Sequence, residues 1–403
     1  MFTDALYQLL ISEEEDCPDA FLNSWKRKRD EEEEEDINLM HRAYNSSTSK
    51  KEPPMKKTRA KNSESVFMYV IDRLTGLPRP GIPGDSLWWI NYVLYPELMT
   101  PRMHFKFRRR FRMPFDAWQG FVAKMKSHDI FKSWHDGASN CTGKKSSPLE
   151  LLSLGAFRYL GRKCTFDDLE ECTFISERTD ERFFHKFIEY GSTVMYNDYI
   201  VAPQTSIEAD LHMHEFRDAG FDGGIGSMDA THVTIENCRY GIRQSHLGFK
   251  LNKTARSYNI IVNHRRRILS STSGHPLTWN DKTLVLFDQF IDNIKRGNVL
   301  ADKEFTLLEK MEDGTIIRVT YRGVWILVDN GYHEWSITIP PFKYVGERKE
   351  LRWSQWMESM RKDVECTFGI LKKRWSILSK GIHAKSVGDA DKVWKMEDLL
   401  CAS

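Results

Sequence analysis

A run of five apolar residues, Val324–Val328 (VWILV), places the tightest constraint on how this 403-residue chain can fold. The run has no polar position, and it stops at Asp329-Asn330-Gly331, a typical turn sequence. A strand with one face in water alternates apolar and polar residues, whereas a strand covered on both faces is apolar throughout. The run therefore predicts a buried central strand, as in an α/β domain.

Neighbouring segments supply the rest of such a domain, which we place at residues 210–403. Further strands are predicted at Ile225–Ile235, Ser257–Asn263 and Arg267–Thr272, the last two joined by a basic turn at 264–266. A later amphipathic helix is predicted because its apolar residues recur every three or four positions. They are Met357, Met360, Val364, Phe368, Leu371 and Trp375.

An all-α region is predicted at 63–205, with three short helices between 148 and 190. Thr165 and Asp168 form a capping pattern at the second helix, and Ser176 is a candidate N-cap for the third. The third helix carries basic residues four positions apart, a helix-turn-helix pattern suited to DNA. They are Arg178, Arg182 and Lys186. Acidic residues on the same helix keep a second interpretation open, in which the stripe only forms ion pairs.

A second basic segment lies between Pro101 and Phe115, where six Lys and Arg interleave with four Phe and no acid. Basic residues among aromatic ones suit phosphate contact. The alternative is a helix whose Phe residues face the core and whose Arg residues face water. Pro114 and Asp116 predict that another helix starts directly after this segment.

The net charge of +2 hides an uneven distribution. Residues 1–61 hold 11 Lys and Arg and 14 Asp and Glu, which leaves +5 for the remainder. Their charge blocks cannot bury enough apolar surface to offset chain ordering, so 1–62 is predicted to be a disordered tail. Its basic runs 26–29 and 56–61 are interpreted as nuclear-import signals or as plain solvated charge, and we expect the chain in the nucleus.

Other classes of protein are disfavoured. The seven cysteines include no CxxC pair, which argues against a disulfide framework or a zinc site and fits a reducing compartment. No apolar run reaches the roughly 18 residues of a membrane helix, and the N-terminus does not look like a secretory signal. We therefore expect no membrane partner.

Three carboxylates stand at positions suited to metal-dependent chemistry. Asp229 lies in the first predicted strand, Asp329 ends the buried strand, and Glu365 lies on the later helix. Such a set can hold two divalent metals, and oxygen ligands without His or Cys favour Mg²⁺ or Mn²⁺. Taken singly, each has a structural alternative: Asp229 as a local cap, Asp329 as the first residue of its turn, and Glu365 as a helical partner for Arg361.

A long stretch without acids follows the strand of Asp229. The 44 residues from Asn237 to Asn280 contain no Asp or Glu. Because acids beside a phosphate backbone would repel it, such a stretch suits a polyanionic substrate. Its basic residues, which we interpret as DNA contacts, are Arg239, Arg243, Lys250, Lys253, Arg256, Arg265, Arg266 and Arg267.

In these segments the sequence resembles the PIF/Harbinger-type transposases and their derived nucleases, within the DDE superfamily of endonucleases. The similar stretches are GSMDATHVTI (226–235), SYNIIVNHRRRILSSTSGHPLTWND (257–281), VWILVDNGY (324–332) and RKDVECTFGILKKRWSIL (361–378). Residues 160–187 and 107–118 also look like the regions ahead of that family's catalytic domain. The resemblance covers roughly residues 100–380.

The resemblance implies an RNase H-like fold, a mixed five-stranded sheet flanked by helices, behind the helix-turn-helix-like region and the tail. It implies Asp229, Asp329 and Glu365 as catalytic, metal-binding residues, with Asp281 as a supporting residue or a rival to Asp329. The implied activity is cutting of double-stranded DNA at terminal repeats, followed by joining of the 3′-hydroxyl to target DNA. A Myb-like accessory protein is an implied partner, and we also expect a homo-oligomer.

Two departures from the family pattern weaken the expectation of activity. Asp229 and Asp329 are 100 residues apart, and 287–321 looks like an insertion. The sequence also stops at Leu400-Cys401-Ala402-Ser403, where the family usually continues. The alternative function is therefore a domesticated protein that binds DNA or chromatin without cutting. A third interpretation is an RNase H-like hydrolase that acts on RNA.

Overall fold

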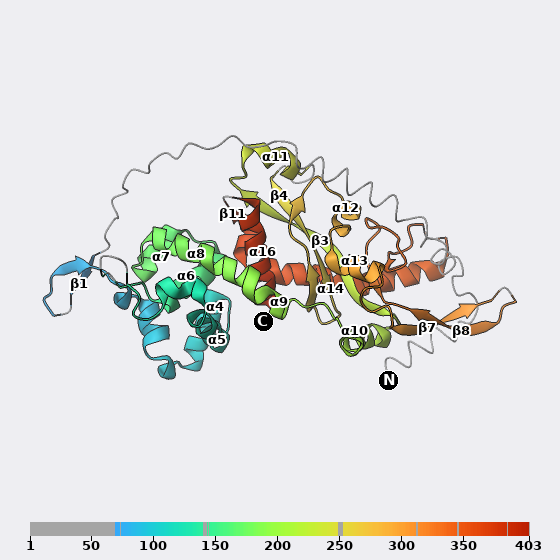
Figure 1. The fold of residues 1–403 in the computed structure, drawn as a ribbon, viewed down its shortest axis with the longest axis horizontal. Helices are drawn as coiled ribbons and strands as arrows, with labels where there is room; N and C mark the ends of the chain where they lie inside the picture. Colours follow the sequence, from blue (N-terminus) through green and yellow to red (C-terminus); the bar gives the residue numbers. More distant parts are fainter. Residues whose placement is uncertain are drawn as a thin grey trace.

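The computed structural model describes residues 69–402, apart from 73, 140–142, 144, 249–252, 312, 345 and 385. A helical region comes first along the chain, and a mixed sheet with its own helices follows (Figure 1). The predicted tail with its basic runs lies outside the described residues, and so does Lys250. No helix of the described part is long and apolar enough to cross a membrane.

The helical region confirms the three helices predicted between 148 and 190. Thr165 and Asp168 form the predicted capping box of the second helix, and the third begins directly after Ser176. The main elements of the region are η2 (Trp89–Leu94), α4 (Pro101–Phe111), α5 (Phe115–Lys126), η4 (Asp129–Trp134), α6 (Leu149–Arg162), α7 (Phe166–Thr173), α8 (Glu177–Tyr190), η5 (Gly191–Met195) and α9 (Tyr196–Tyr199). A small hairpin of β1 (Tyr69–Ile71) and β2 (Pro78–Pro80) and the short turns η1 (Pro83–Asp85) and η3 (Pro96–Leu98) precede α4.

The basic and aromatic segment forms α4, and its Phe residues behave largely as core residues. Phe107 and Phe111 are fully buried, whereas Phe105 is exposed. Arg108, Arg109 and Arg110 face solvent at the end of the helix. The interpretation of a helix with a buried Phe face is therefore confirmed for two of its three Phe residues, and α5 starts after Pro114 as predicted.

The sheet contains the four predicted strands. Its central path runs β10-β9-β3-β4-β5. The pairs β3–β4 and β4–β5 are antiparallel, whereas β9 is parallel to β3 and β10 is parallel to β9. Their bounds are β3 (Gly224–Glu236), β4 (Ala255–Val262), β5 (Ile268–Ser271), β9 (Trp325–Leu327) and β10 (Thr338–Ile339). Two-residue strands, β6 (His275–Pro276) and β11 (Ile382–His383), pair with β4 and β3 and bring the total to seven rather than five. Strands that short leave no periodicity in a sequence.

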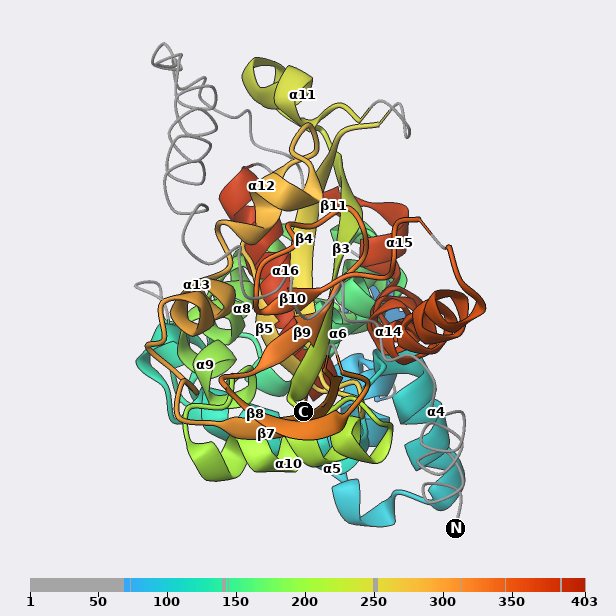
Figure 2. The ribbon, with the colours of Figure 1, turned by 90° about the vertical axis from the view of Figure 1, so that its right-hand side faces the viewer.

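Helices and a separate hairpin surround this sheet (Figure 2). The predicted amphipathic helix is α14 (Arg348–Arg374), which starts nine residues before Met357 and ends just before Trp375. The stretch 287–321 contains a helix and the hairpin. The remaining elements are α10 (Ser206–Asp218), α11 (Tyr240–His246), α12 (Asp281–Val285), α13 (Gln289–Lys295), β7 (Glu304–Lys310), β8 (Ile316–Arg322), α15 (Ser376–Lys380) and α16 (Val387–Ala402).

Two apolar cores meet along β3 and α14. The first joins the helical region to α16 and to the later parts of β3 and α14, including Val233 and Val364. The second packs α10, β9 and α13 against the earlier parts, including Met228 and Met360. Asp229 follows Met228 and Arg361 follows Met360, so both polar residues lie at the seam between the cores.

Candidate active site

Asp229 lies on β3, and Asp329 lies two residues past the end of β9, the neighbouring parallel strand. Ser227 on β3 is paired with Leu327 on β9, and each carboxylate lies two residues further along its own strand direction. Because side chains two residues apart on a strand point to the same face, this register brings the two carboxylates side by side. The sheet therefore joins two residues that are 100 positions apart in the sequence.

Both carboxylates also accept a local backbone hydrogen bond. The Ala230 N–H donates to Asp229 Oδ1 at 2.8 Å, and the Gly331 N–H donates to Asp329 Oδ1 at 2.7 Å. The second bond is the turn contact that the structural alternative predicted for Asp329. These bonds leave each carboxylate a second oxygen, so the local contact and a role in a site are compatible.

Asp281, at the start of α12, reaches the same place through a glycine. A Cβ on Gly331 would lie 2.7 Å from Asp281 Oδ2 and 2.9 Å from Asp329 Oδ1. The missing side chain thus allows the two carboxylates to approach each other closely. We call Asp229, Asp281 and Asp329 the carboxylate cluster.

Arg361 joins this cluster to α14. Its guanidinium contacts Asp229 Oδ2 at 3.2 Å and Glu365 Oε1 at 3.3 Å, and it also contacts Glu358 Oε2 at 3.1 Å. The Arg361 side chain is only 10% exposed, whereas that of Glu365 is 53% exposed. The helical pairing of Glu365 with Arg361 is present, as the structural alternative predicted, and the same arginine brings Glu365 toward the sheet.

Partial burial and neighbouring carboxylates both disfavour the charged form of Asp229. Burial raises the pKa of Asp229 to about 6, and the nearby carboxylates of Asp329 and Asp281 add to the rise. Arg361 and the Ala230 amide act in the opposite direction. Two further negative charges beside Asp229 make a cation favourable here.

The chemistry of these donors fits a hard divalent cation, since all are carboxylate oxygens. Within the described residues, however, no group of three or more His, Cys, Asp or Glu side chains is arranged to hold a metal ion. The cation that these carboxylates contact in this structure is the Arg361 guanidinium. A metal bound by both Asp229 and Glu365 would therefore share them with Arg361 or displace it.

The sequence analysis missed two residues of α14 that face β3. The spacing of four residues predicted the pairing of Arg361 with Glu365, but nothing in the sequence indicated the contact of Arg361 with Asp229 on β3. It gave Lys372 no specific contact, yet Lys372 Nζ donates to Thr231 Oγ1 at 2.7 Å and to the His232 carbonyl at 3.1 Å. Burial lowers the pKa of Lys372.

The predicted DNA contacts near the sheet fall into different surroundings. Arg239, Arg243, Lys253 and Arg267 are exposed. Arg265 pairs with Glu215 at 2.6 Å, and Arg266 pairs with Asp363 at 3.1 Å.

Arg256 differs from the other predicted contacts. It is 7% exposed, and its guanidinium binds Asp391 and the Gly274 carbonyl. Because the guanidinium is buried and paired, the structure does not support a DNA contact for Arg256.

The basic stripe of α8 is exposed as the pattern predicts. Arg182 lies over the Trp134 ring at 5.4 Å, and Lys186 pairs with Glu189 at 2.9 Å. The ion-pair interpretation is therefore confirmed for Lys186. Arg178 and Arg182 are exposed, and a DNA contact for them stays a prediction.

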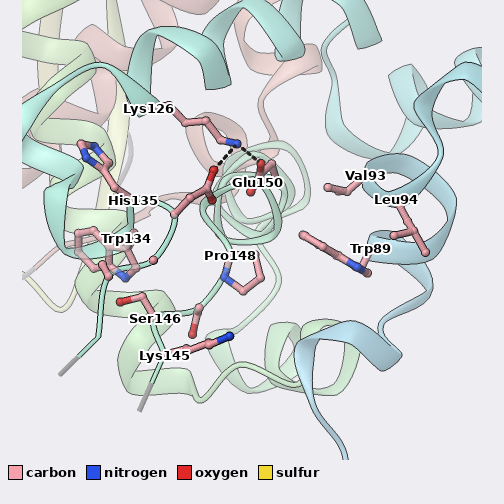
Figure 3. Close-up of a pocket in the computed structure, with 14 residues that line it drawn as sticks. Trp89, Val93, Leu94, Lys126, Trp134, His135, Lys145, Ser146, Pro148 and Glu150 are labelled. Atoms are coloured by element: carbon pink, nitrogen blue, oxygen red, sulfur yellow. Dashed lines mark hydrogen bonds and ion pairs between the residues drawn. The ribbon is translucent and has the colours of Figure 1, made fainter. Parts of the chain in front are cut away.

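A pocket in the helical region is a separate feature (Figure 3). Trp89, Trp134 and Lys145 are among its lining residues, and Lys126 contacts Glu150 at 2.5 Å in its wall. No residue of the sheet lines it. It is therefore distinct from the carboxylate cluster.

Comparison with known families agrees with this arrangement. A mixed α/β protein with acidic residues gathered at adjacent strands is the class that the fold and the site define. The family model described as plant transposon protein matches residues 197–398, half of the chain and nearly all of the sheet region. The chain belongs to this plant transposon protein family. No curated protein and no solved structure matches it significantly.

Proposed function

We propose that this protein is a DDE-type transposase of the PIF/Harbinger kind, which cuts DNA at transposon ends and joins the 3′-hydroxyl to target DNA. The observation that carries the proposal is the register of β3 and β9, which sets Asp229 beside Asp329, with Arg361 linking Glu365 to the same place. Membership of a transposon protein family supports the same class of activity. The five-stranded central path fits the RNase H-like architecture that the resemblance implies.

In this proposal Asp229, Asp329 and Glu365 hold two divalent ions, Mg²⁺ or Mn²⁺, and Asp281 supports Asp329 from α12. When bound, such ions supply an activated attacking oxygen and neutralise charge on both oxygens of an in-line displacement at phosphorus. The protein's own contribution is positional. Two strands and one helix, fixed by the cores on either side of the seam, hold the carboxylates, and exposed basic residues such as Arg239, Arg243 and Arg267 attract the DNA backbone.

The direct test is nicking of a terminal-repeat duplex by the purified protein with Mn²⁺. Substituting a residue that only supports a metal ligand commonly costs 10- to 100-fold, so we expect Asp229→Ala and Glu365→Ala each to cost more than about 100-fold. Asp292→Ala is the matched control, because Asp292 is an exposed acid paired with Arg296 on α13, outside the cluster. Equal cutting by wild type and both site variants would show that the assignment is wrong. A comparison of duplex DNA with an RNA–DNA hybrid tests the RNA-directed alternative.

A second candidate function is DNA or chromatin binding without cleavage. The observation that favours it is Arg361, whose guanidinium already contacts Asp229 and Glu365 and neutralises part of their charge. Calorimetric titration with Mn²⁺ distinguishes the two functions. A nuclease should lose most of its Mn²⁺ affinity on Asp229→Ala, whereas a protein that only binds DNA should show little affinity that depends on this residue.

A further inference from the structure

Five arginines gather where the end of α4 meets α6. Arg158 Nη1 donates to the Arg110 carbonyl at 3.4 Å, and Arg162 Nη2 donates to the Arg109 carbonyl at 3.1 Å. The Arg112 side chain lies against Gly161 of α6, where a Cβ would be 2.7 Å from Arg112 Cγ. We call Arg109, Arg110, Arg112, Arg158 and Arg162 the arginine cluster.

The cluster lacks a counter-charge in the described part of the chain. Among the described residues, no member of the cluster forms an ion pair with a carboxylate, in contrast to Arg79, Arg217 and Arg361. The Nε atoms of Arg112 and Arg162 are buried without a hydrogen-bond partner. Burial lowers the pKa of Arg162, and its neighbours Arg112, Arg158 and Arg109 lower it further.

A purely structural role accounts for only part of this arrangement. Arg158 and Arg162 bind the last carbonyl groups of α4, and cations are favourable at that end of a helix. The helix end supplies the equivalent of only about −0.5 charge, however, against five positive charges. Crowded cations without an acidic partner are costly, so the excess charge points to an anion from outside the chain.

Helix α14 connects this cluster to the carboxylate cluster. Arg374, at the end of α14, donates from Nε to the Arg112 carbonyl at 2.9 Å. Figure 1 shows the helix running from the sheet toward the helical region. Glu365 and Arg374 are nine residues apart, which corresponds to about 14 Å along the helix axis at ~1.5 Å per residue. That length equals the rise of about four base-pair steps along the axis of a DNA duplex, at ~3.4 Å each.

We propose that the arginine cluster binds the DNA backbone about four base-pair steps along the duplex axis from the phosphate that lies at the carboxylate cluster. This inference rests on the proposed function, since it requires DNA as the substrate. Planar guanidinium groups bind phosphate oxygens in pairs, which suits a cluster of arginines better than one of lysines. An acidic protein segment would supply similar charges, but the spacing along α14 favours the strand that enters the candidate site.

The test measures the affinity of the full chain for a random-sequence DNA duplex in EDTA over a range of KCl concentrations. Each lost phosphate contact lowers the slope of log affinity against log salt by about 1. The triple variant Arg109→Gln, Arg158→Gln, Arg162→Gln should therefore lose about 3 from this slope and bind more weakly at every salt concentration. The variant with Lys at the same three positions keeps the charges and should retain most of the slope.

A matched control removes positive charges from exposed arginines outside the arginine cluster. Arg318 on β8 and Arg348 at the start of α14 are exposed, and Arg318→Gln, Arg348→Gln should leave the slope unchanged. Thermal melting reports whether each variant is folded. If the triple Gln variant does not fold, Arg109→Gln, Arg110→Gln replaces it, because both side chains are exposed and neither binds the carbonyl groups of α4.

The outcomes separate this inference from the proposed function. If the wild type binds DNA and the folded Gln variant shows the same slope of log affinity against log salt, the arginine cluster is not a DNA contact. The proposed function is unaffected by that result. Wild type that does not bind DNA at all overturns both. Binding of polyglutamate that the Gln variant loses, with DNA binding unchanged, would assign the cluster to an acidic protein and overturn the inference as well.

Discussion

The carboxylate cluster and the acids of α16 are both withdrawn from solvent, but their surroundings differ. In the cluster, Asp229 lies beside Asp329 and Asp281, and one arginine is shared with two glutamates on α14. On α16, Asp391 has its own arginine: Arg256 Nε and Nη2 bind its two oxygens at 2.8 and 2.7 Å. In the first group several carboxylates lie near one shared arginine, whereas Asp391 forms a closed ion pair with an arginine of its own.

For two further acids of α16, burial favours the neutral form instead. Glu397 and Asp398 are fully buried. Burial raises the pKa of Asp398 to about 8 and that of Glu397 well above its usual value. Asp398 also accepts a hydrogen bond from Ser271 Oγ at 2.6 Å. A raised pKa therefore does not identify a functional site by itself. The carboxylate cluster is set apart by like charges side by side and by partial access to solvent.

The largest effect should come from breaking the closed pair. Asp391→Ala leaves the Arg256 guanidinium buried without its carboxylate, which should destabilise the fold by about 3–5 kcal/mol. Asp329→Ala removes one of several like charges and should cost far less stability, although it should abolish cutting. Urea unfolding measures both variants. Similar losses of stability would mean that the two groups of acids do not differ in the way described.

An intermediate effect should come from Gly331, whose missing side chain leaves room for the carboxylates of Asp281 and Asp329. In Gly331→Ala the new Cβ displaces the carboxylates of Asp281 and Asp329, and a displacement of about 1 Å can cost up to 10²-fold in rate. We expect about a 10- to 100-fold loss of Mn²⁺-dependent nicking with the fold intact. Gly369→Ala on α14 is the control: its Cβ meets open space, so the variant should gain roughly 0.5–1 kcal/mol of stability and keep its activity. Equal nicking activity of the two variants would show that the space beside Gly331 does not matter for the placement of the two carboxylates.

At pH 5 the smallest effect should come from Asp398→Asn, because burial keeps the Asp398 carboxyl neutral at that pH and the amide is neutral as well. The folded chain holds the Asp398 proton up to about pH 8, whereas the ordinary pKa is 3.8. The folded state therefore binds more protons than the unfolded state between these values, and stability falls as pH rises through this window. The variant lacks this dependence, so the fall from pH 5 to 8 should become shallower by up to about 1.4 kcal/mol per pH unit. Urea unfolding at several pH values measures it, and identical slopes would mean that Asp398 is already ionised.

Local patterns predicted much of the fold. The apolar run before Asp329, the alternation around Asp229 and the spacing from Met357 to Trp375 correspond to β9, β3 and α14. The capping pattern at Thr165 predicted α7. Each of these patterns reflects contacts within one strand or one helix turn. Residues close together in the sequence are therefore enough to reveal it. The two-residue strands β6 and β11 left no such signal, since only their pairing partners define them.

The sequence by itself determined which carboxylates were candidates, because a strand end, a turn and a helical repeat fix where Asp229, Asp329 and Glu365 stand on their own elements. Only the tertiary structure decided what each charge meets. The register of β3 and β9 brought together two acids 100 residues apart. Arg361 links Asp229 to Glu365 on α14. Arg256, a predicted DNA contact, forms a buried pair with Asp391. Burial and the nearest opposite charge depend on residues far apart in the sequence, and no local spacing encodes them.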